Sequence, residues 1–157
     1  MIPLKINNKH LCEIFEDIST DGWNDATVQE YCLRKQMFPT SVELVSETYS
    51  RDAERTADYE LEYLTLINRK AKPTFTWSLI KADYVRKLLG FLGYEYNFKN
   101  EDGVVISQDA PDIHVTYLDF IGLRTITAYL GQTLEGTLVE YDGEQYWENF
   151  TIAFPER

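Results

Sequence analysis

Hydrophobic residues recur with two different periods along this 157-residue chain, and the period changes near Pro39. Before Pro39, apolar residues three and four apart predict a short helix over 9–18 and a second helix from about 25 to 37. The second helix is expected to end there, because the residue that precedes a proline avoids the helical region. The same spacing predicts the clearest helix of the chain over 84–92, with Gly93 as its C-terminal cap.

After Pro39 most apolar residues alternate with polar ones, which is typical of strands with one buried face. This pattern predicts seven or eight strands, in the segments 42–49, 59–68, 74–79, 94–98, 113–117, 123–130, 133–141 and 145–154. Asp142-Gly143 lies between the last two strands. We expect a tight type I′ hairpin at this dipeptide, because such a turn needs positive φ at both central residues.

The order of these elements predicts a mainly β, α+β fold. Antiparallel hairpins with a helix between the third and fourth strands favour a β-sandwich or a partly open barrel with one flanking helix. The two N-terminal helices form a short helical insert at about 8–38. We expect a single domain over 1–157, because the length is typical of one domain and no Pro/Gly-rich linker divides the chain.

The net charge of the chain limits the classes of partner that it can bind. The chain has 26 acidic and 15 basic residues, a net charge of −11. Free nucleic acid and anionic membranes are therefore disfavoured, because both attract dense basic surfaces. The acidity can serve solubility alone, suit basic partners, or repel DNA that passes nearby. We expect the protein to be made in a cytoplasm, since no signal-peptide core and no run of about 18 apolar residues is present.

The sequence offers no pattern of residues typical of catalysis, cofactor binding or metal binding. His10, expected in the first helix, and His114, expected on the outer face of a strand, have no partner motif. Cys12 and Cys32 are twenty residues apart without further ligands at zinc spacing, so we expect two reduced, partly buried thiols. We therefore predict no catalytic, cofactor-binding or metal-binding residues and no cofactor.

Two other residue types leave alternatives open. Paired carboxylates could serve a small hydrolase, although pairs arise by chance among so many acids; the candidates are Asp52/Glu54, Glu60/Glu62 and Glu101/Asp102. Aromatic residues could form a carbohydrate-binding surface, although alternating aromatics more often belong to a core or a subunit interface. The three tryptophans considered for this surface are Trp23, Trp77 and Trp147.

Several segments together resemble a known family. They are Pro3–Asn7, Phe75-Thr76-Trp77, the helix over 85–92, Val115-Thr116-Tyr117, and the ending from Tyr141-Asp142-Gly143 through Trp147-Glu148-Asn149-Phe150 to Arg157. In these segments the chain resembles small tail-module proteins of phages and prophages of Gram-positive bacteria. The resemblance covers about 40–157 and the first seven residues. It departs in the helical insert, which is longer, and in 129–133, which lacks a Gly-Asp-Arg-like turn.

The resemblance implies a non-enzymatic virion structural protein. Tail-tube and tail-tip proteins of this kind are β-sandwiches with one flanking helix that join edge to edge into rings. The partners would be further copies of the chain and other tail proteins, with no direct nucleic acid and no membrane. The protein would be in the host bacterial cytoplasm during assembly and afterwards in the virion tail. The alternative from a different class is a carbohydrate-binding β-sandwich module.

Overall fold

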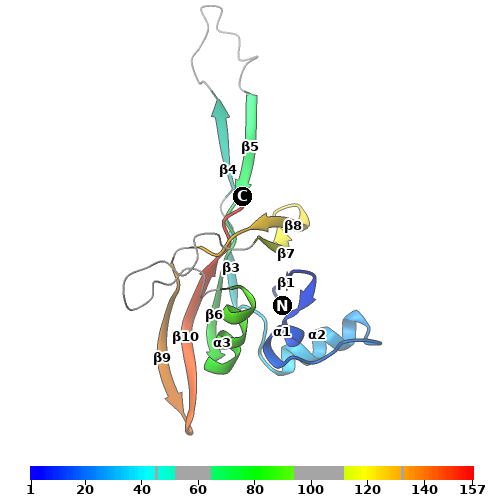
Figure 1. The fold of residues 1–157 in the computed structure, drawn as a ribbon, viewed down its shortest axis with the longest axis vertical. Helices are drawn as coiled ribbons and strands as arrows, with labels where there is room; N and C mark the ends of the chain where they lie inside the picture. The colour runs from blue at the N-terminus through cyan, green and yellow to red at the C-terminus, as the bar shows by residue number, and fades with distance from the viewer. Residues whose placement is uncertain (45, 52–64, 94–111, 132) are drawn as a thin grey trace, which may run out of the picture.

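Two four-stranded antiparallel sheets and a separate two-stranded ribbon make up most of the computed structural model, which describes residues 1–44, 46–51, 65–93, 112–131 and 133–157 (Figure 1). The first sheet has the order β2-β1-β7-β8. Its strands are β1 (Leu4–Ile6), β2 (Lys9–His10), β7 (Ile113–Asp119) and β8 (Gly122–Ala128). In β7, Ile113, Val115 and Tyr117 are buried while His114 is exposed, as the alternation predicts.

The second sheet has the order β3-β6-β10-β9. Its strands are β3 (Ser41–Glu43), β6 (Thr74–Lys81), β10 (Glu144–Ala153) and β9 (Glu135–Tyr141). The strands β9 and β10 form a long hairpin that extends beyond the body of the molecule (Figure 1). Its turn has φ 51° at Asp142 and φ 81° at Gly143. This confirms the predicted hairpin, with both central residues at positive φ.

A two-stranded ribbon projects from the two sheets as an arm (Figure 1). It consists of β4 (Ser46–Arg51) and β5 (Thr65–Ala71). The predicted strand over 42–49 is therefore wrong as one element, because β3 joins the second sheet and β4 joins the arm. Of the predicted strand over 59–68, only 65–68 is described, and it belongs to β5. The predicted strand over 94–98 lies outside the described residues.

The structure has three helices in its described part: α1 (Leu11–Glu16), α2 (Asp25–Arg34) and α3 (Ala82–Phe91). The first begins later than the apolar spacing predicts, because Lys9 and His10 pair with β1. The side chain of Asn24 caps α2 by accepting a 2.8 Å hydrogen bond from the backbone N–H of Thr27. Gly93 follows α3 with φ 71°, in agreement with its predicted capping role.

Aromatic side chains connect the two sheets in the core. The ring of Phe75 on β6 meets that of Tyr117 on β7 edge to face at 6.3 Å, and it meets Phe154 at 6.0 Å. Trp77 lies 5.7 Å from Phe150 on the neighbouring strand β10. The fold is thus mainly antiparallel β with few helices, a sandwich-like α+β arrangement as the sequence predicts.

Candidate functional site

The outer strand β9 presents one side of the second sheet to solvent. It pairs with β10, and no other described strand pairs with it. Its residues are exposed except Val139, which is half-buried. An outer strand of this kind has backbone N–H and C=O groups that a strand from another chain can bind.

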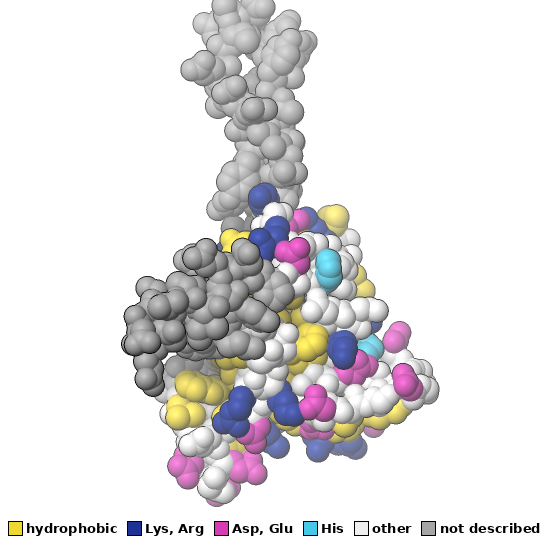
Figure 2. Space-filling view, in the orientation of Figure 1, with side chains coloured by type: hydrophobic (Ala, Val, Ile, Leu, Met, Phe, Trp, Pro, Cys, Tyr) yellow, Lys and Arg dark blue, Asp and Glu magenta, His cyan; other side chains and the backbone are white. Residues whose placement is uncertain are grey.

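Acidic and aromatic side chains cover the β9–β10 hairpin. Between 133 and 153 the sequence has no Lys or Arg, and its five acids are Glu135, Glu140, Asp142, Glu144 and Glu148. Acidic side chains gather at the far end of this hairpin in Figure 2. A partner for this surface would need to supply positive charge or be met at high salt, since like charges placed together repel.

Two tyrosines of this hairpin donate hydrogen bonds to two of its glutamates. The hydroxyl of Tyr141 donates to Glu148 Oε1 at 2.8 Å, and that of Tyr146 donates to Glu144 Oε2 at 3.0 Å. Their rings lie 5.9 Å apart and are tilted by 56°. The hydrogen bonds to carboxylates raise the pKa of both phenols. Because the rings are tilted, the pair does not form the flat platform on which a sugar ring stacks.

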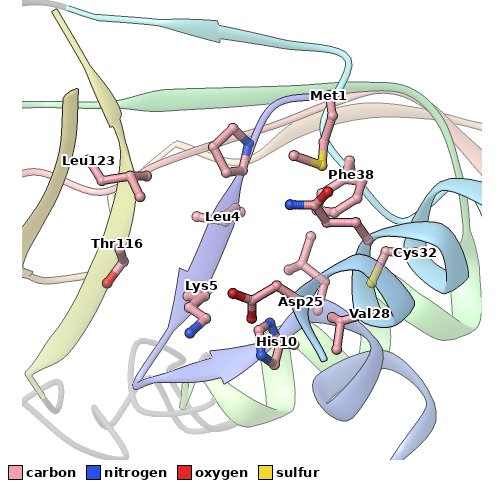
Figure 3. A pocket seen from close by; sticks show the side chains of 13 residues that line it. Met1, Leu4, Lys5, His10, Asp25, Val28, Cys32, Phe38, Thr116 and Leu123 are labelled. Carbon is pink, nitrogen blue, oxygen red and sulfur yellow. The ribbon is translucent and has the colours of Figure 1, made fainter. Parts of the chain in front are cut away.

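A groove lies between α2 and the first sheet (Figure 3). Its volume is about 240 Å³ and its walls are mainly apolar. Val28 and Cys32 of α2 line one side, Leu4 of β1 lies centrally, and Leu123 of β8 lies on the opposite side. Met1 is at the groove's end near Phe38. The groove is therefore formed by segments that are far apart in the sequence.

Three ionisable side chains lie at the lower end of the groove in Figure 3: Lys5, His10 and Asp25. Burial lowers the pKa of His10 below its ordinary value of 6.5, and the nearby charge of Lys5 lowers it further. The lowered pKa favours the neutral imidazole. Within the described ranges no three His, Cys, Asp or Glu side chains are placed to hold a metal ion. This end of the groove offers one charge of each sign.

An apolar hairpin tip lies beside the groove, at the turn between β7 and β8. Phe120 is 72% exposed and Ile121 is 96% exposed. Leu118 and Leu123 pair across the two strands just below them, with exposed fractions of 47% and 69%. Hairpin turns are usually polar, so four exposed apolar side chains within six residues are unusual. We name these four residues the apolar tip.

Asp119 forms hydrogen bonds within the turn that carries the apolar tip. Its Oδ1 accepts the Phe120 N–H at 2.6 Å, and its Oδ2 accepts from Tyr117 Oη at 3.2 Å and from Arg124 at 3.1 Å. Arg124 also donates to Glu156 near the end of the chain, at 3.2 Å. Burial alone would raise the pKa of Asp119, but these hydrogen bonds outweigh it and lower the pKa. The turn is thus held by interactions that do not involve the four apolar side chains.

Of the residues singled out from the sequence, His10 and Cys32 line the groove. His114 is exposed on β7, as predicted, and its Nδ1 lies 3.3 Å from the hydroxyl of Thr127. His10 belongs to β2, not to the first helix, and it lines the groove. Cys12 and Cys32 are buried free thiols, with their side chains in hydrogen-bond contact. Burial raises the pKa of Cys32 to about 12.

The remaining candidates divide between the core and undescribed segments. Trp77 is 1% exposed, and its indole N–H donates to the Met37 carbonyl at 2.8 Å, so it serves the core. Trp147 is half-buried, and Trp23 is 36% exposed. The carboxylate pairs proposed for a hydrolase all lie outside the described residues; they are Asp52/Glu54, Glu60/Glu62 and Glu101/Asp102.

The apolar tip and the groove were not predicted from the sequence. A signal for the tip was present, since Phe120-Ile121 occupies a turn between two alternating runs where polar residues are expected. None of the helices in the described part of the chain has the length and apolar character needed to cross a bilayer. Compared with known proteins, the chain matches no family model, no curated protein and no solved structure.

Proposed function

We propose that this protein is a non-enzymatic structural subunit of a phage or prophage tail, which joins further copies or other tail proteins through its strand edges. The observation that carries the proposal is the edge of β9, which is exposed along the described length of the hairpin that extends beyond the body. Addition of a neighbour's strand would satisfy the outward backbone groups of β9. The resemblance of the chain's opening and ending to tail-module proteins supports the choice of a tail.

The arm supplies a second argument for assembly. Strands β4 and β5 pair with each other and with no other described strand. A two-stranded ribbon is marginally stable in water by itself, because it lacks a third strand or a helix to cover one face. A neighbouring subunit that packs on the arm would provide that cover. Placement in the host cytoplasm during assembly, and then in the virion tail, follows from the same proposal.

Acidity explains how such a subunit remains soluble before assembly. The five acids of the β9–β10 hairpin repel the same hairpin of another copy at low salt. Salt screens this repulsion beyond about 8 Å at physiological ionic strength. Association through β9 is therefore expected to increase with both protein and salt concentration.

Light scattering and negative-stain imaging over a range of protein and salt concentrations test the proposal. Wild-type protein should form larger particles as salt rises. The variant Leu138→Asp, which adds a charge to the middle of β9, should remain smaller under the same conditions. Particles that do not grow with salt, or that grow equally in the variant, would contradict assembly through β9. Specific binding on a glycan panel by a strictly monomeric protein would favour the carbohydrate-binding alternative.

A further inference from the structure

We infer that the apolar tip and the adjoining groove form a second association surface, through which two copies of the chain pair about a two-fold axis. In this pairing the tip of each copy enters the groove of the other. The inference does not depend on strand-edge assembly, because it involves the first sheet and α2, whereas β9 belongs to the second sheet.

The tip and the groove form one continuous surface. Leu123 belongs to the apolar tip and also lines the groove with Leu4 and Met1. Apolar side chains are visible at the outer end of the β7–β8 hairpin in Figure 2. The exposed parts of Met1 and the four tip residues amount to roughly 700 Å² if each side chain offers about 200 Å². This approaches the ~800 Å² that each partner of a standard protein interface contributes.

The tip has the properties of a preformed contact. The hydrogen bonds of Asp119 fix the backbone of the turn before any partner arrives. Little backbone entropy is then lost when Phe120 and Ile121 become buried. Side chains that are rigidly presented and become fully buried at the centre of an interface contribute most of its binding energy. These two residues are the expected centre of the contact.

A second copy fits this surface because the surface contains both a projection and a hollow. Two-fold pairing brings the same patch of both copies together, so each tip can meet the partner's groove. The charges around the groove also favour a second copy of the chain as the partner. Lys5 and Asp25 at the groove have opposite signs, and Asp119 forms an ion pair with Arg124, which also pairs with Glu156. Two copies therefore meet less like-charge repulsion here than between two β9–β10 hairpins, which carry five acids and no Lys or Arg.

Sedimentation velocity tests the pairing with three proteins from about 1 to 200 μM, a range that covers dissociation constants of weak and moderate dimers. Wild type should pass from one 18.3 kDa chain to a dimer as concentration rises. The variant Ile121→Asp should raise the dissociation constant more than about 100-fold, because symmetry places two new charges in the interface. Leu138→Asp is the matched control on β9 and should dimerise like the wild type.

Cysteine cross-linking tests the arrangement. Gln29 is an exposed residue of α2 that lines the groove. A mixture of the Ile121→Cys and Gln29→Cys proteins should form a disulfide-linked heterodimer under mild oxidation by glutathione disulfide, which is reduced to glutathione. A mixture of Ile121→Cys and Thr137→Cys should not, because Thr137 is on β9.

The outcomes separate this inference from strand-edge assembly. A monomeric wild type at every concentration, or equal dimerisation by Ile121→Asp, would overturn the pairing and leave assembly through β9 untouched. Binding of a monomeric wild type to phosphatidylcholine vesicles, lost in Ile121→Asp, would assign the tip to a lipid surface and would also overturn it. Dimerisation without the mixed cross-link would overturn the tip-in-groove arrangement. If Leu138→Asp still forms dimers but loses the salt-dependent particles, the result would support both the pairing through the tip and the separate assembly through β9.

Discussion

A partly buried carboxylate joins the three helices, and removal of one of its hydrogen bonds should destabilise the protein. Glu16 at the end of α1 accepts hydrogen bonds from the hydroxyls of Tyr31 on α2 and Tyr84 on α3, the latter at 2.5 Å. The ring of Tyr84 also stacks on Phe15 at 5.1 Å. The substitution Tyr84→Phe keeps this stacking and removes only the hydroxyl. It therefore isolates one hydrogen bond to a charged acceptor.

The expected loss of stability in Tyr84→Phe depends on how well the Tyr84–Glu16 hydrogen bond is shielded from solvent. A hydrogen bond to a charged group contributes about 1.5–3 kcal/mol when it is well shielded. The pair is part-buried, so solvent screening reduces the expected loss to about 1–2 kcal/mol. For a protein of this length such a loss lowers the melting temperature by roughly 2–8 °C. The exposed variant Tyr146→Phe, which loses a comparable bond to Glu144 in solvent, is the control and should show no measurable change.

The stability lost in Tyr84→Phe should also depend on pH. Burial raises the pKa of Glu16, but the hydrogen bonds from Tyr31 and Tyr84 and the charges of Lys35 and Lys81 outweigh it and lower the pKa below its ordinary value of 4.5. A carboxyl with a lowered pKa in the folded state stabilises the fold above the unfolded-state value. This contribution is lost as pH falls through the folded-state value. The difference in the free energy of unfolding between wild type and Tyr84→Phe should then become smaller.

Urea unfolding at pH 7 and at pH 3 measures this difference directly. Tyr84→Phe should be less stable than wild type at pH 7 and closer to it at pH 3. Equal stability at pH 7 would show that the hydroxyl contributes nothing. A loss of the same size at both pH values would show that the charge of Glu16 is not involved. Either result would refute the reasoning.

Three further predictions concern other residues. Gly143→Val should cost about 1–2 kcal/mol in urea unfolding, because φ is 81° there although space for a side chain is open; Gly90→Ala, in α3 with equally open space, is the control and should not destabilise. Cys12 and Cys32 should react with a thiol reagent at pH 8 only after unfolding, because burial raises the pKa of both; rapid labelling of native protein would contradict this. Metal analysis should find no stoichiometric zinc bound to the purified protein, and one equivalent would overturn the prediction that the chain lacks a metal site.

The fold was predictable where the alternation is long and one face is buried. Strands β6, β7 and β10 each contain a run of alternate residues that pack into the core, as does the apolar face of α3. The hairpin at Asp142-Gly143 was predictable because it depends on local backbone conformation. Strands β1 and β2 have only three and two residues, which is too short for a period to show. Strand β1 also pairs with β7, more than a hundred residues away.

The division of 42–49 between two sheets could not be read from its pattern. Alternation predicts that a segment is extended, but it does not specify the strand with which the segment pairs. In the structure Val42 pairs with Phe75 of β6, whereas Ser46 pairs with Ala71 of β5. Non-local pairing of this kind is decided by packing and by the path of the chain. The arm therefore had no distinct signal in the sequence.

The two proposed surfaces differ in how visible they are in the sequence, and the reason is physical. The acids of the β9–β10 hairpin lie in one short stretch of the chain, 135–148, so their repulsion can be predicted before the structure is known. The groove is formed by α2, β1 and β8, which only the fold brings together. Alternation in β7 already places Leu118 on the outer face with His114 and Thr116, but only the register shows that Leu123 lies beside it.

Because the β9 edge is acidic and the tip is apolar, association through the two surfaces should respond differently to salt concentration. Contact through β9 is opposed by the acids of both hairpins, so it should be weak at low salt and strengthen as the repulsion is screened. Contact through the apolar tip removes hydrophobic surface from water and brings together few unpaired charges, so it should already operate at low salt. Dimers would then form first, and growth beyond the dimer would begin only when salt allows the edges of β9 to meet. A subunit with this order of association remains small and soluble until its neighbours are concentrated.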